Sequence, residues 1–138
     1  MKIELICIEK TKKIEYKNII QDYLKRINRK LDLTIKEITF ANTKKQTRKS
    51  ILTKQTNLIK RYINDKDYVV LLDEEGKSFS SINFSKWINQ KISSRNTKCL
   101  KFIIGGPYGF NKKNFNLFHE KISFSKMTFS HQMIRIFV

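Results

Sequence analysis

Hydrophobic and polar positions alternate from the start of the chain. Over residues 2–8 the apolar side chains Ile3, Leu5 and Cys7 occupy every second position, which is the period of a strand. Over residues 14–27 the apolar side chains change to helical spacing, which predicts an amphipathic helix with lysines on its wet face. The chain is therefore expected to open with a strand followed by a helix.

A second strand and helix are predicted next. Leu33 begins a Thr-rich strand that is expected to end near Phe40, and residues 41–50 form a polar, cationic stretch that predicts a loop. The helix that follows has an apolar stripe made of Ile51, Leu52, Gln55, Leu58, Ile59 and Tyr62.

Two later runs are apolar almost without interruption, one from Tyr68 to Asp73 and the other from Leu100 to Ile104. Such runs are typical of strands buried on both faces of a parallel sheet. Between them, Ser80 or Ser81 is expected to cap a helix. The core side of that helix would carry Phe84, Trp87, Ile88 and Ile92.

The last third of the chain predicts a helix with Phe115 and Phe118 turned inward, and then a strand over residues 122–129. Residues 131–138 fit either a helix or a strand, because the segment is short and rich in β-branched residues. The order βαβαβαβα predicts an α/β fold with a mainly parallel sheet and flanking helices, in one domain over residues 1–138.

The composition narrows the class of protein. The chain has 138 residues, of which 40% are hydrophobic, and a formal net charge of +17. A small protein of this charge usually meets nucleic acid, because lysines that neutralise phosphates release condensed counterions. A competing explanation is the codon bias of an AT-rich genome, which enriches Lys and depletes Ala and Pro. Only six of the 29 basic residues are Arg, and the chain has one Ala and one Pro.

The cysteines and the lack of a long apolar run point to a cytoplasmic protein. No run approaches the roughly 20 residues that span a bilayer, and the alternating start does not fit a signal peptide. Cys7 and Cys99 each lie inside an apolar run, which favours buried, reduced thiols over a disulfide or a metal site.

Candidate chemistry lies where the predicted parallel strands end, because ligands of open α/β sheets bind beyond the carboxyl ends of strands. Three loops are expected there, at residues 72–77, 105–110 and 124–129. The sequence GGPYG in the second loop permits close approach of a ligand to the backbone, although such a loop is more often only a turn. It matches neither a dinucleotide fingerprint nor a P-loop, which argues against a nucleoside triphosphate.

The two histidines give little support for hydrolysis or metal binding. His119 is expected in a helix and facing solvent, whereas His131 follows the third loop together with Gln132 and Arg135. No Ser or Cys nucleophile has a spacing that suggests a triad, and two His with two scattered Cys make no metal site.

Three segments together carry a family resemblance. They are LLDEEGK at 71–77, FIIGGPYG at 102–109 and ISFSKMTFSHQMIR at 122–135. In this order and spacing, the chain closely resembles the ribosomal RNA large-subunit methyltransferase H family, which are small SPOUT methyltransferases with a trefoil knot. The resemblance runs from end to end and is most specific in SFSKMTF.

The resemblance implies a homodimeric enzyme that uses S-adenosyl-L-methionine to methylate N3 of a pseudouridine in 23S rRNA within the ribosome. It also implies a C-terminal α/β knot that holds the cofactor, with no metal and no membrane partner. Carried over by position, the cofactor contacts fall at Leu72, Gly105, Phe124, Ser125, Lys126, Met127, Thr128 and Phe129. We expect Leu72, Gly105 and Met127 to share one pocket.

The imide N3 must lose its proton before methyl transfer, so a base or an electrostatic stabiliser is needed. His131 is a candidate to assist, and Arg135 is a candidate to hold a phosphate or polarise the base. A structural ion pair or a dimer contact is the alternative for Arg135.

Family members continue past the position of Val138 with the rest of a helix and a tail. We therefore expect a shortened C-terminal end and a knot that is incomplete. Two other functions stay open: a catalytically impaired relative that only binds RNA or the ribosome, and a generic nucleotide-binding α/β domain. Saturable binding of S-adenosylmethionine separates an enzyme from a bare RNA binder, and steep salt dependence identifies RNA binding.

Overall fold

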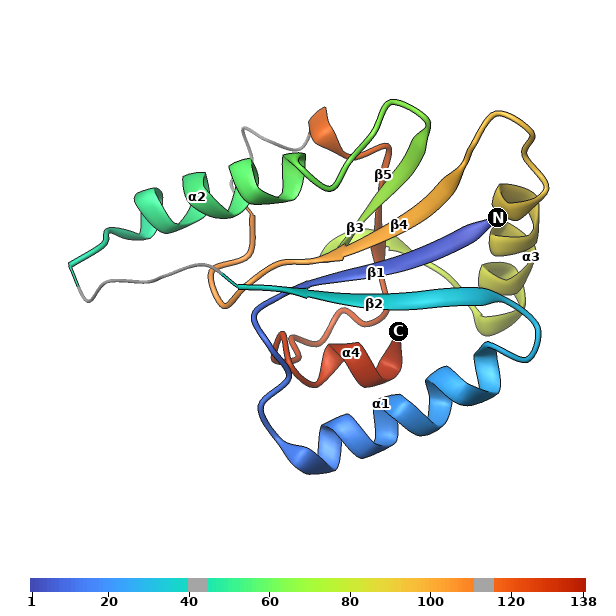
Figure 1. Ribbon diagram of the computed structural model, residues 1–138, viewed down its shortest axis with the longest axis horizontal. Coiled ribbons are helices and arrows are strands. Elements are labelled where there is room, and N and C mark those ends of the chain that lie inside the picture. Colours follow the sequence, from blue (N-terminus) through green and yellow to red (C-terminus); the bar gives the residue numbers. More distant parts are fainter. Residues whose placement is uncertain (40–44, 111–115) are drawn as a thin grey trace.

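The computed structural model describes residues 1–39, 45–110 and 116–138. Its described strands form one five-stranded parallel sheet in the order β2-β1-β4-β3-β5 (Figure 1). The elements are β1 (Lys2–Ile8), α1 (Ile14–Ile27), β2 (Asp32–Ile38), α2 (Arg48–Lys60), β3 (Asp67–Ser78), α3 (Ser81–Ile92), β4 (Cys99–Ile104), β5 (Glu120–Ser123) and α4 (Ile134–Phe137). The predicted α/β class with a parallel sheet is confirmed, whereas the knot stays a prediction.

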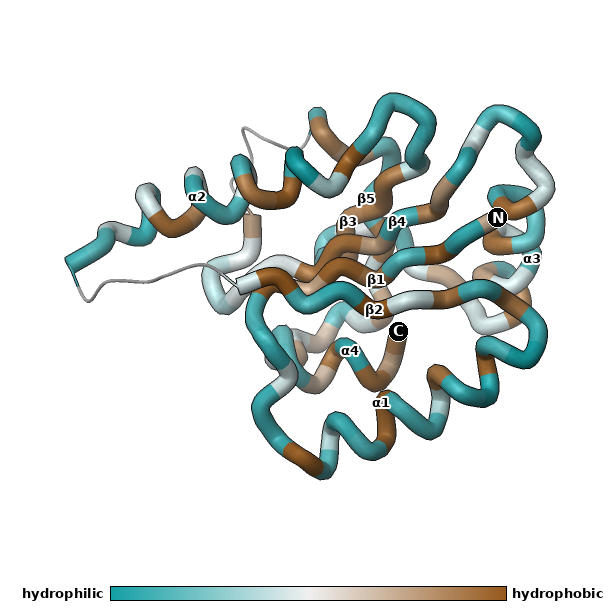
Figure 2. Tube along the Cα trace, in the orientation of Figure 1, coloured by the Kyte–Doolittle hydropathy of each residue, from teal (hydrophilic) through white to brown (hydrophobic). Residues whose placement is uncertain are grey.

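The central strands are buried on both faces. Their successive side chains point to opposite faces, so each face has its own hydrophobic core. The face covered by α3 and α4 buries Ile3, Leu5, Cys7, Val70, Leu100, Phe102, Ile104 and Ile122. The face covered by α2 buries Ile6, Ile8, Ile38, Val69, Leu71 and Ile103, with Ile59 of α2 packed among them. Figure 2 shows hydrophobic positions concentrated in the central strands. Burial on both faces of these strands explains their near-continuous apolar sequence.

Several predicted elements are confirmed by the structure. The helix expected over residues 14–27 is α1, and the helix expected after Ser80 is α3. The side chain of Ser80 accepts a hydrogen bond from the backbone N–H of Asn83 at 3.2 Å, as an N-cap does. Phe40 and residues 41–44 of the predicted strand end and loop lie outside the described residues.

The expectation of a loop at residues 72–77 was wrong, because β3 continues to Ser78. Leu72 and Lys77 both pair with Ile122, so residues 73–76 bulge out of the ladder between them. At the base of the bulge, a Cβ on Gly76 would lie 2.6 Å from the backbone nitrogen of Ile122. Only glycine therefore lets the bulged strand return to β5 at this point.

The last third of the chain also departs from expectation. The strand predicted over residues 122–129 is the shorter β5, which ends at Ser123, and residues 134–137 form the helical alternative for the C-terminal segment. Phe115 lies outside the described residues; residues 116–119 form no α-helix, although Phe118 is buried as expected.

A charged cluster closes the amino-terminal end of the sheet. The Lys101 ammonium lies 2.8 Å from the Asp67 carboxylate and 3.4 Å from that of Glu4, which also pairs with Lys36 at 2.9 Å. Only 6% of the Lys101 side chain is exposed. The positive and negative charges of this cluster are thus matched within the chain.

Candidate functional site

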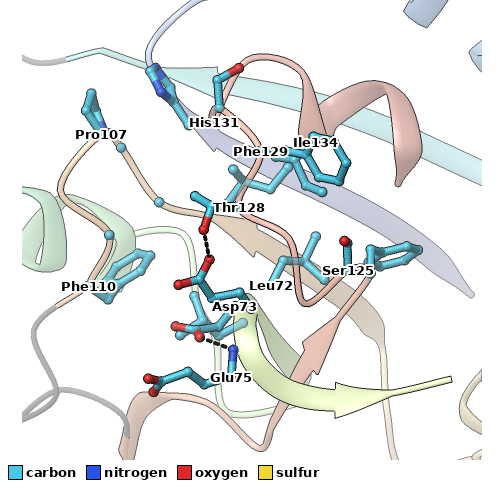
Figure 3. Close-up of a pocket in the computed structure, with 18 of the residues that line it drawn as sticks. Leu72, Asp73, Glu75, Pro107, Phe110, Ser125, Thr128, Phe129, His131 and Ile134 are labelled. Carbon is cyan, nitrogen blue, oxygen red and sulfur yellow. Dashed lines mark hydrogen bonds between the residues drawn. The ribbon is translucent and has the colours of Figure 1, made fainter.

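A cavity of about 600 Å³ opens at the carboxyl ends of β3 and β4 (Figure 3). Its walls come from three parts of the chain: the β3 bulge, the loop of residues 105–110 that we call the glycine loop, and residues 124–131 after β5. Parallel strands bring these distant segments to one edge of the sheet, which is the usual ligand site of an open α/β fold.

The glycine loop is held from below by Gln55 of α2. The Gln55 side chain accepts a hydrogen bond from the Gly106 N–H at 3.1 Å and donates one to the Gly109 carbonyl at 2.9 Å. A Cβ on Gly106 would lie 2.9 Å from the Gln55 side-chain oxygen, so a larger residue there would displace the Gln55 amide from its present position. Gln55 is 2% exposed, and its amide thereby fixes the shape of the cavity's glycine wall.

The β3 bulge brings three carboxylates to the cavity, those of Asp73, Glu74 and Glu75. Asp73 accepts a hydrogen bond from the Glu75 N–H at 2.8 Å, and Glu74 accepts one from the Thr128 hydroxyl at 2.5 Å (Figure 3). Among the described residues that line the cavity, none is Lys or Arg. The cavity of this strongly basic protein is therefore acidic, and it favours a cationic ligand over a phosphate.

The remaining walls of the cavity are apolar. They are formed by Leu72, Ile104, Phe110, Ile122, Phe124, Phe129 and Ile134. Two of these rings are held by other aromatic side chains. Phe124 packs edge-on against Phe84 with ring centroids 5.0 Å apart, and the ring centroids of Phe129 and Phe137 are 4.9 Å apart. This combination of apolar walls with a few polar groups is typical of cofactor sites.

The segment after β5 turns sharply because serine side chains bond to its own backbone. The Ser123 hydroxyl donates to the Ser125 carbonyl at 2.8 Å, and the Met127 N–H donates to the Ser125 hydroxyl at 2.9 Å. Such local bonds replace the ladder of a strand, which is why β5 stops early. Met127 is 75% exposed at the cavity's edge.

The structure brings together most of the proposed cofactor contacts. Leu72, Gly105 and Met127 line the same cavity, and so do Phe124, Ser125, Thr128 and Phe129. Lys126 is exposed and lies outside the lining. Cofactor binding by these side chains stays a prediction.

His131 lines the cavity and is tied to the first strand. Its Nε2 lies 3.1 Å from a carboxylate oxygen of Glu9, which directly follows β1. Glu9 has a backbone φ of +71°, which is unusual for a residue other than glycine. The neighbouring Gln132 accepts a hydrogen bond from the Lys12 N–H and donates one to the Lys10 carbonyl, which fixes this end of the chain against the loop after β1.

Arg135 does not line the cavity. Its guanidinium donates to the carbonyls of Ile8 and His131 at 2.7 and 2.9 Å, and to the Thr11 hydroxyl at 2.9 Å. The side chain is 1% exposed and lies 3.8 Å from the carboxylate of Glu37. These contacts favour the structural alternative over a direct contact with RNA, because the guanidinium is almost fully buried and each of its nitrogens bonds within the chain.

Sequence reasoning did not identify Gln55 or Glu9 as parts of the site. A signal for Gln55 was present, since it is an amide on an otherwise apolar helical stripe, and a buried amide needs partners. Glu9 carried no such signal, because nothing in a glutamate predicts a left-handed backbone. The acidic bulge was visible as residues 73–75, but its projection into the cavity depends on the register shift.

The remaining histidine and the two cysteines lie outside the cavity. His119 is exposed as predicted, but it does not lie in a helix: its Nδ1 accepts a hydrogen bond from the Val69 N–H at 3.0 Å. Cys7 and Cys99 are buried free thiols, and burial raises their pKa values to about 12 and about 11.

In residues 1–39, 45–110 and 116–138, no three His, Cys, Asp or Glu side chains are grouped so as to hold a metal ion. Over the same ranges, no helix combines the length and the apolar character that a bilayer span requires.

A model of the family described as predicted SPOUT methyltransferase matches residues 1–138. The chain therefore belongs to the SPOUT methyltransferases, a family that implies methylation dependent on S-adenosylmethionine.

Three relatives, each called ribosomal RNA large subunit methyltransferase H, make the likeness more specific. The chain is 44% identical to the one from Bacteroides fragilis and 43% identical to the one from Phocaeicola vulgatus, over 137 residues in each case. It is 41% identical over 138 residues to the one from Christiangramia forsetii. Each match covers 99% of this chain and 87% of the relative. These relatives confirm the family resemblance that the three sequence segments predicted.

Proposed function

We propose that this SPOUT methyltransferase transfers a methyl group from S-adenosyl-L-methionine to ribosomal RNA. The specific target, carried over from the family resemblance, is N3 of a pseudouridine in 23S rRNA within the ribosome. One observation carries the assignment of the cavity: three carboxylates and a set of apolar walls meet there, with no Lys or Arg among the described lining residues.

The lining fits this cofactor by charge and by polarity. When bound, S-adenosylmethionine supplies an electrophilic methyl group on a cationic sulfonium. Asp73, Glu74 and Glu75 favour positive charge at the cavity. The apolar walls suit an adenosine ring, and the backbone groups of the glycine loop can hydrogen-bond its edge without a phosphate-binding cradle.

Within this arrangement the chain orients the reaction and removes a proton. Gln55 fixes the glycine loop, and Phe84 and Phe137 hold Phe124 and Phe129 in place. His131 is the proposed general base that accepts the imide proton at one of its ring nitrogens. Glu9, 3.1 Å from Nε2, orients that ring and stabilises its protonated form. Arg135 positions His131 by bonding to its carbonyl.

The decisive experiment combines binding and product mapping. Calorimetry with S-adenosylmethionine should give saturable heat, and incubation with labelled cofactor and ribosomes that lack the modification should label one mapped pseudouridine. Binding of RNA without any saturable heat from the cofactor would favour a non-catalytic RNA binder. A mapped label on a different nucleotide would retain the methyltransferase and refute the target.

A variant at His131 tests its role. We expect His131→Ala to lower the single-turnover rate constant by about 10²–10⁴-fold, with little change in cofactor affinity. The matched control is His119→Gln, because His119 is an exposed histidine outside the cavity. Loss of a pKa from the pH–rate profile in His131→Ala would support the base assignment, and an unchanged profile would refute it.

We also propose that the protein works as a homodimer in the cytoplasm, where it meets ribosomes. Ile19 and Tyr23 of α1 and Phe137 of α4 are 41%, 50% and 55% exposed, and these two helices lie against each other (Figure 1). A second copy of the chain would cover these apolar side chains. Sedimentation equilibrium should therefore show a dimer that Tyr23→Glu weakens; a monomeric wild-type chain would refute this proposal.

A further inference from the structure

Helix α2 is cationic along its whole length. It carries Arg48, Lys49, Lys54 and Lys60, and no Asp or Glu lies between Arg48 and Lys60. In the part of the chain that the structure describes, none of these four cations forms an ion pair with a carboxylate. The charge of α2 is therefore available to a partner.

Helix α1 provides a contrast that codon bias does not explain. It carries the acidic residues Glu15 and Asp22 beside its cations, and Asp22 pairs with Arg26 at 3.0 Å. Both helices are lysine-rich surfaces of the same chain, yet of these two only α2 lacks acidic residues. Helix α3 also lacks them, but its Lys91 pairs with Glu120 of β5 at 2.9 Å. A general excess of lysine would raise the positive charge of both helices without removing the acids from one of them.

The position of α2 places this charge beside the cavity. Figure 1 shows α2 extending past the edge of the sheet, with its N-terminal end farthest from the core. Arg48 shares a helical face with Gln55, seven residues later, and Gln55 holds the glycine loop. The Arg48 guanidinium lies over the ring of Tyr108 at 5.6 Å from its centroid, and Tyr108 belongs to the same loop.

The cavity itself is a poor place for a phosphate backbone, because Asp73, Glu74 and Glu75 repel phosphates there. An RNA strand whose base enters the cavity must have its phosphates neutralised on a surface nearby. Of the elements that contact the cavity's loops, α2 offers such a surface, and Tyr108, which is 48% exposed, offers a ring on which a base can stack.

We propose that α2 is the RNA-docking element of this protein. Its cations bind the phosphate backbone next to the target nucleotide, and Tyr108 stacks on a base at the rim of the cavity. This inference rests on the proposed function for its RNA substrate. It adds the surface that holds the RNA and separates that surface from the site that holds the cofactor.

The test compares charge removal on the two helices in the full chain. Lys49→Gln/Lys54→Gln removes two exposed cations from α2, and Lys17→Gln/Lys25→Gln removes two exposed cations from α1. Affinity for fluorescently labelled single-stranded RNA and for ribosomal large subunits is measured between about 50 and 200 mM salt. Calorimetry with S-adenosylmethionine accompanies each variant as a check of the fold and the cavity.

The α2 variant should bind RNA about tenfold more weakly and should reduce the salt slope by about 1.4, or about 0.7 for each lost phosphate contact. The α1 variant should change neither quantity. Equal losses in both variants, or an unchanged salt slope in the α2 variant, would overturn the proposal. Loss of binding to large subunits without loss of binding to RNA would also overturn it and would indicate an acidic protein partner.

Substitution of Tyr108 tests the stacking contact. Tyr108→Phe should preserve RNA affinity, whereas Tyr108→Ala should weaken it by roughly fivefold or more. Equal affinities of these two variants would remove Tyr108 from the docking element. RNA affinity is measured without cofactor, so failure of the methyltransferase proposal would appear separately, as absent cofactor binding in the wild-type chain.

Discussion

The two ends of the sheet use the same charged residue types in opposite ways. At the amino-terminal end, Lys101 is surrounded by Asp67 and Glu4, and the cluster is nearly sealed from solvent. At the carboxyl end, Asp73 and Glu75 lie on a bulge at an open cavity, where no Lys or Arg of the described lining opposes them. Charges matched within the chain support the fold, whereas charges left unmatched at a cavity are available to a ligand.

This contrast predicts its largest effect at Lys101. Lys101→Met should lower the free energy of unfolding by about 3–5 kcal/mol, because it leaves the Asp67 carboxylate buried without its ion-pair partner and leaves Glu4 with Lys36 alone. Urea unfolding measures the loss, and Lys98→Met at an exposed lysine is the control. Adding Asp67→Asn and Glu4→Gln should restore much of the stability. A loss below about 1 kcal/mol would show that the cluster behaves like a surface ion pair.

Neutralising the carboxylates of the cavity should have the opposite effect: it should weaken ligand binding and leave the stability of the fold nearly unchanged. Asp73→Asn/Glu75→Gln should weaken binding of S-adenosylmethionine about five- to tenfold, because two nearby negative charges are lost. The free energy of unfolding should change by no more than about 0.5 kcal/mol. S-adenosylhomocysteine lacks the sulfonium charge, so its affinity should fall less. Equal losses for both ligands would refute the role of charge.

The matched charges also give stability a defined pH dependence. Burial alone would raise the pKa of Glu4, but Lys36 and Lys101 outweigh it and hold the pKa below the ordinary 4.5. A carboxyl with a lowered pKa stabilises the fold above its unfolded pKa, and this contribution is lost as the pH falls through the folded value.

Glu120 contributes to stability in the same direction as Glu4. Burial would raise the pKa of its carboxyl, but hydrogen bonds from Tyr68 and Lys91 outweigh burial and lower the pKa below the ordinary value. Conversely, burial would lower the pKa of Lys101, but Asp67 and Glu4 raise it above the ordinary 10.5, so its contribution is lost as the pH rises through the folded value. Urea unfolding across pH should show stability falling below about pH 4.5 and again at high pH. Lys101→Met should flatten the alkaline decline, and an unchanged decline would contradict the assignment.

The smallest effect is expected from the cysteines. Burial raises the pKa of Cys7 to about 12 and that of Cys99 to about 11, so the reactive thiolate is scarce near neutral pH. A disulfide reagent should leave both thiols of the folded protein unmodified at about pH 8 and should modify both in denaturant. Fast modification in the native state would show that these strands open locally.

The parts of the fold that hydrophobic spacing defines could be predicted from the sequence. The run from Tyr68 to Asp73 is buried on both faces as its composition indicates, and the α1 bounds follow its apolar stripe. The end of β5 could not be predicted in this way, because the alternation of ISFSKMTF continues past Ser123. What ends the strand is the hydroxyl of Ser125, which bonds to the local backbone in place of a neighbouring strand.

The site was predictable where segments identify a family and not where it depends on register or backbone angle. The glycine loop and the segment after β5 could be recognised from their residues. The projection of Asp73 and Glu75 into the cavity requires the register shift between Leu72 and Lys77, which local sequence does not encode. The burial of Arg135 depends equally on the distant residues Thr11 and Ile8.

At Glu9, a substitution that makes the fold more stable would weaken the proposed catalytic machinery. Its left-handed backbone costs about 1–2 kcal/mol, part of which Glu9→Gly would recover despite the greater entropy that glycine loses on folding. Among the described residues, Glu9 provides the only carboxylate within ion-pair distance of the His131 ring, and the same substitution would remove it. A search for hardier variants would therefore select a change that loosens the proposed base, and screens of this protein should score turnover together with melting temperature.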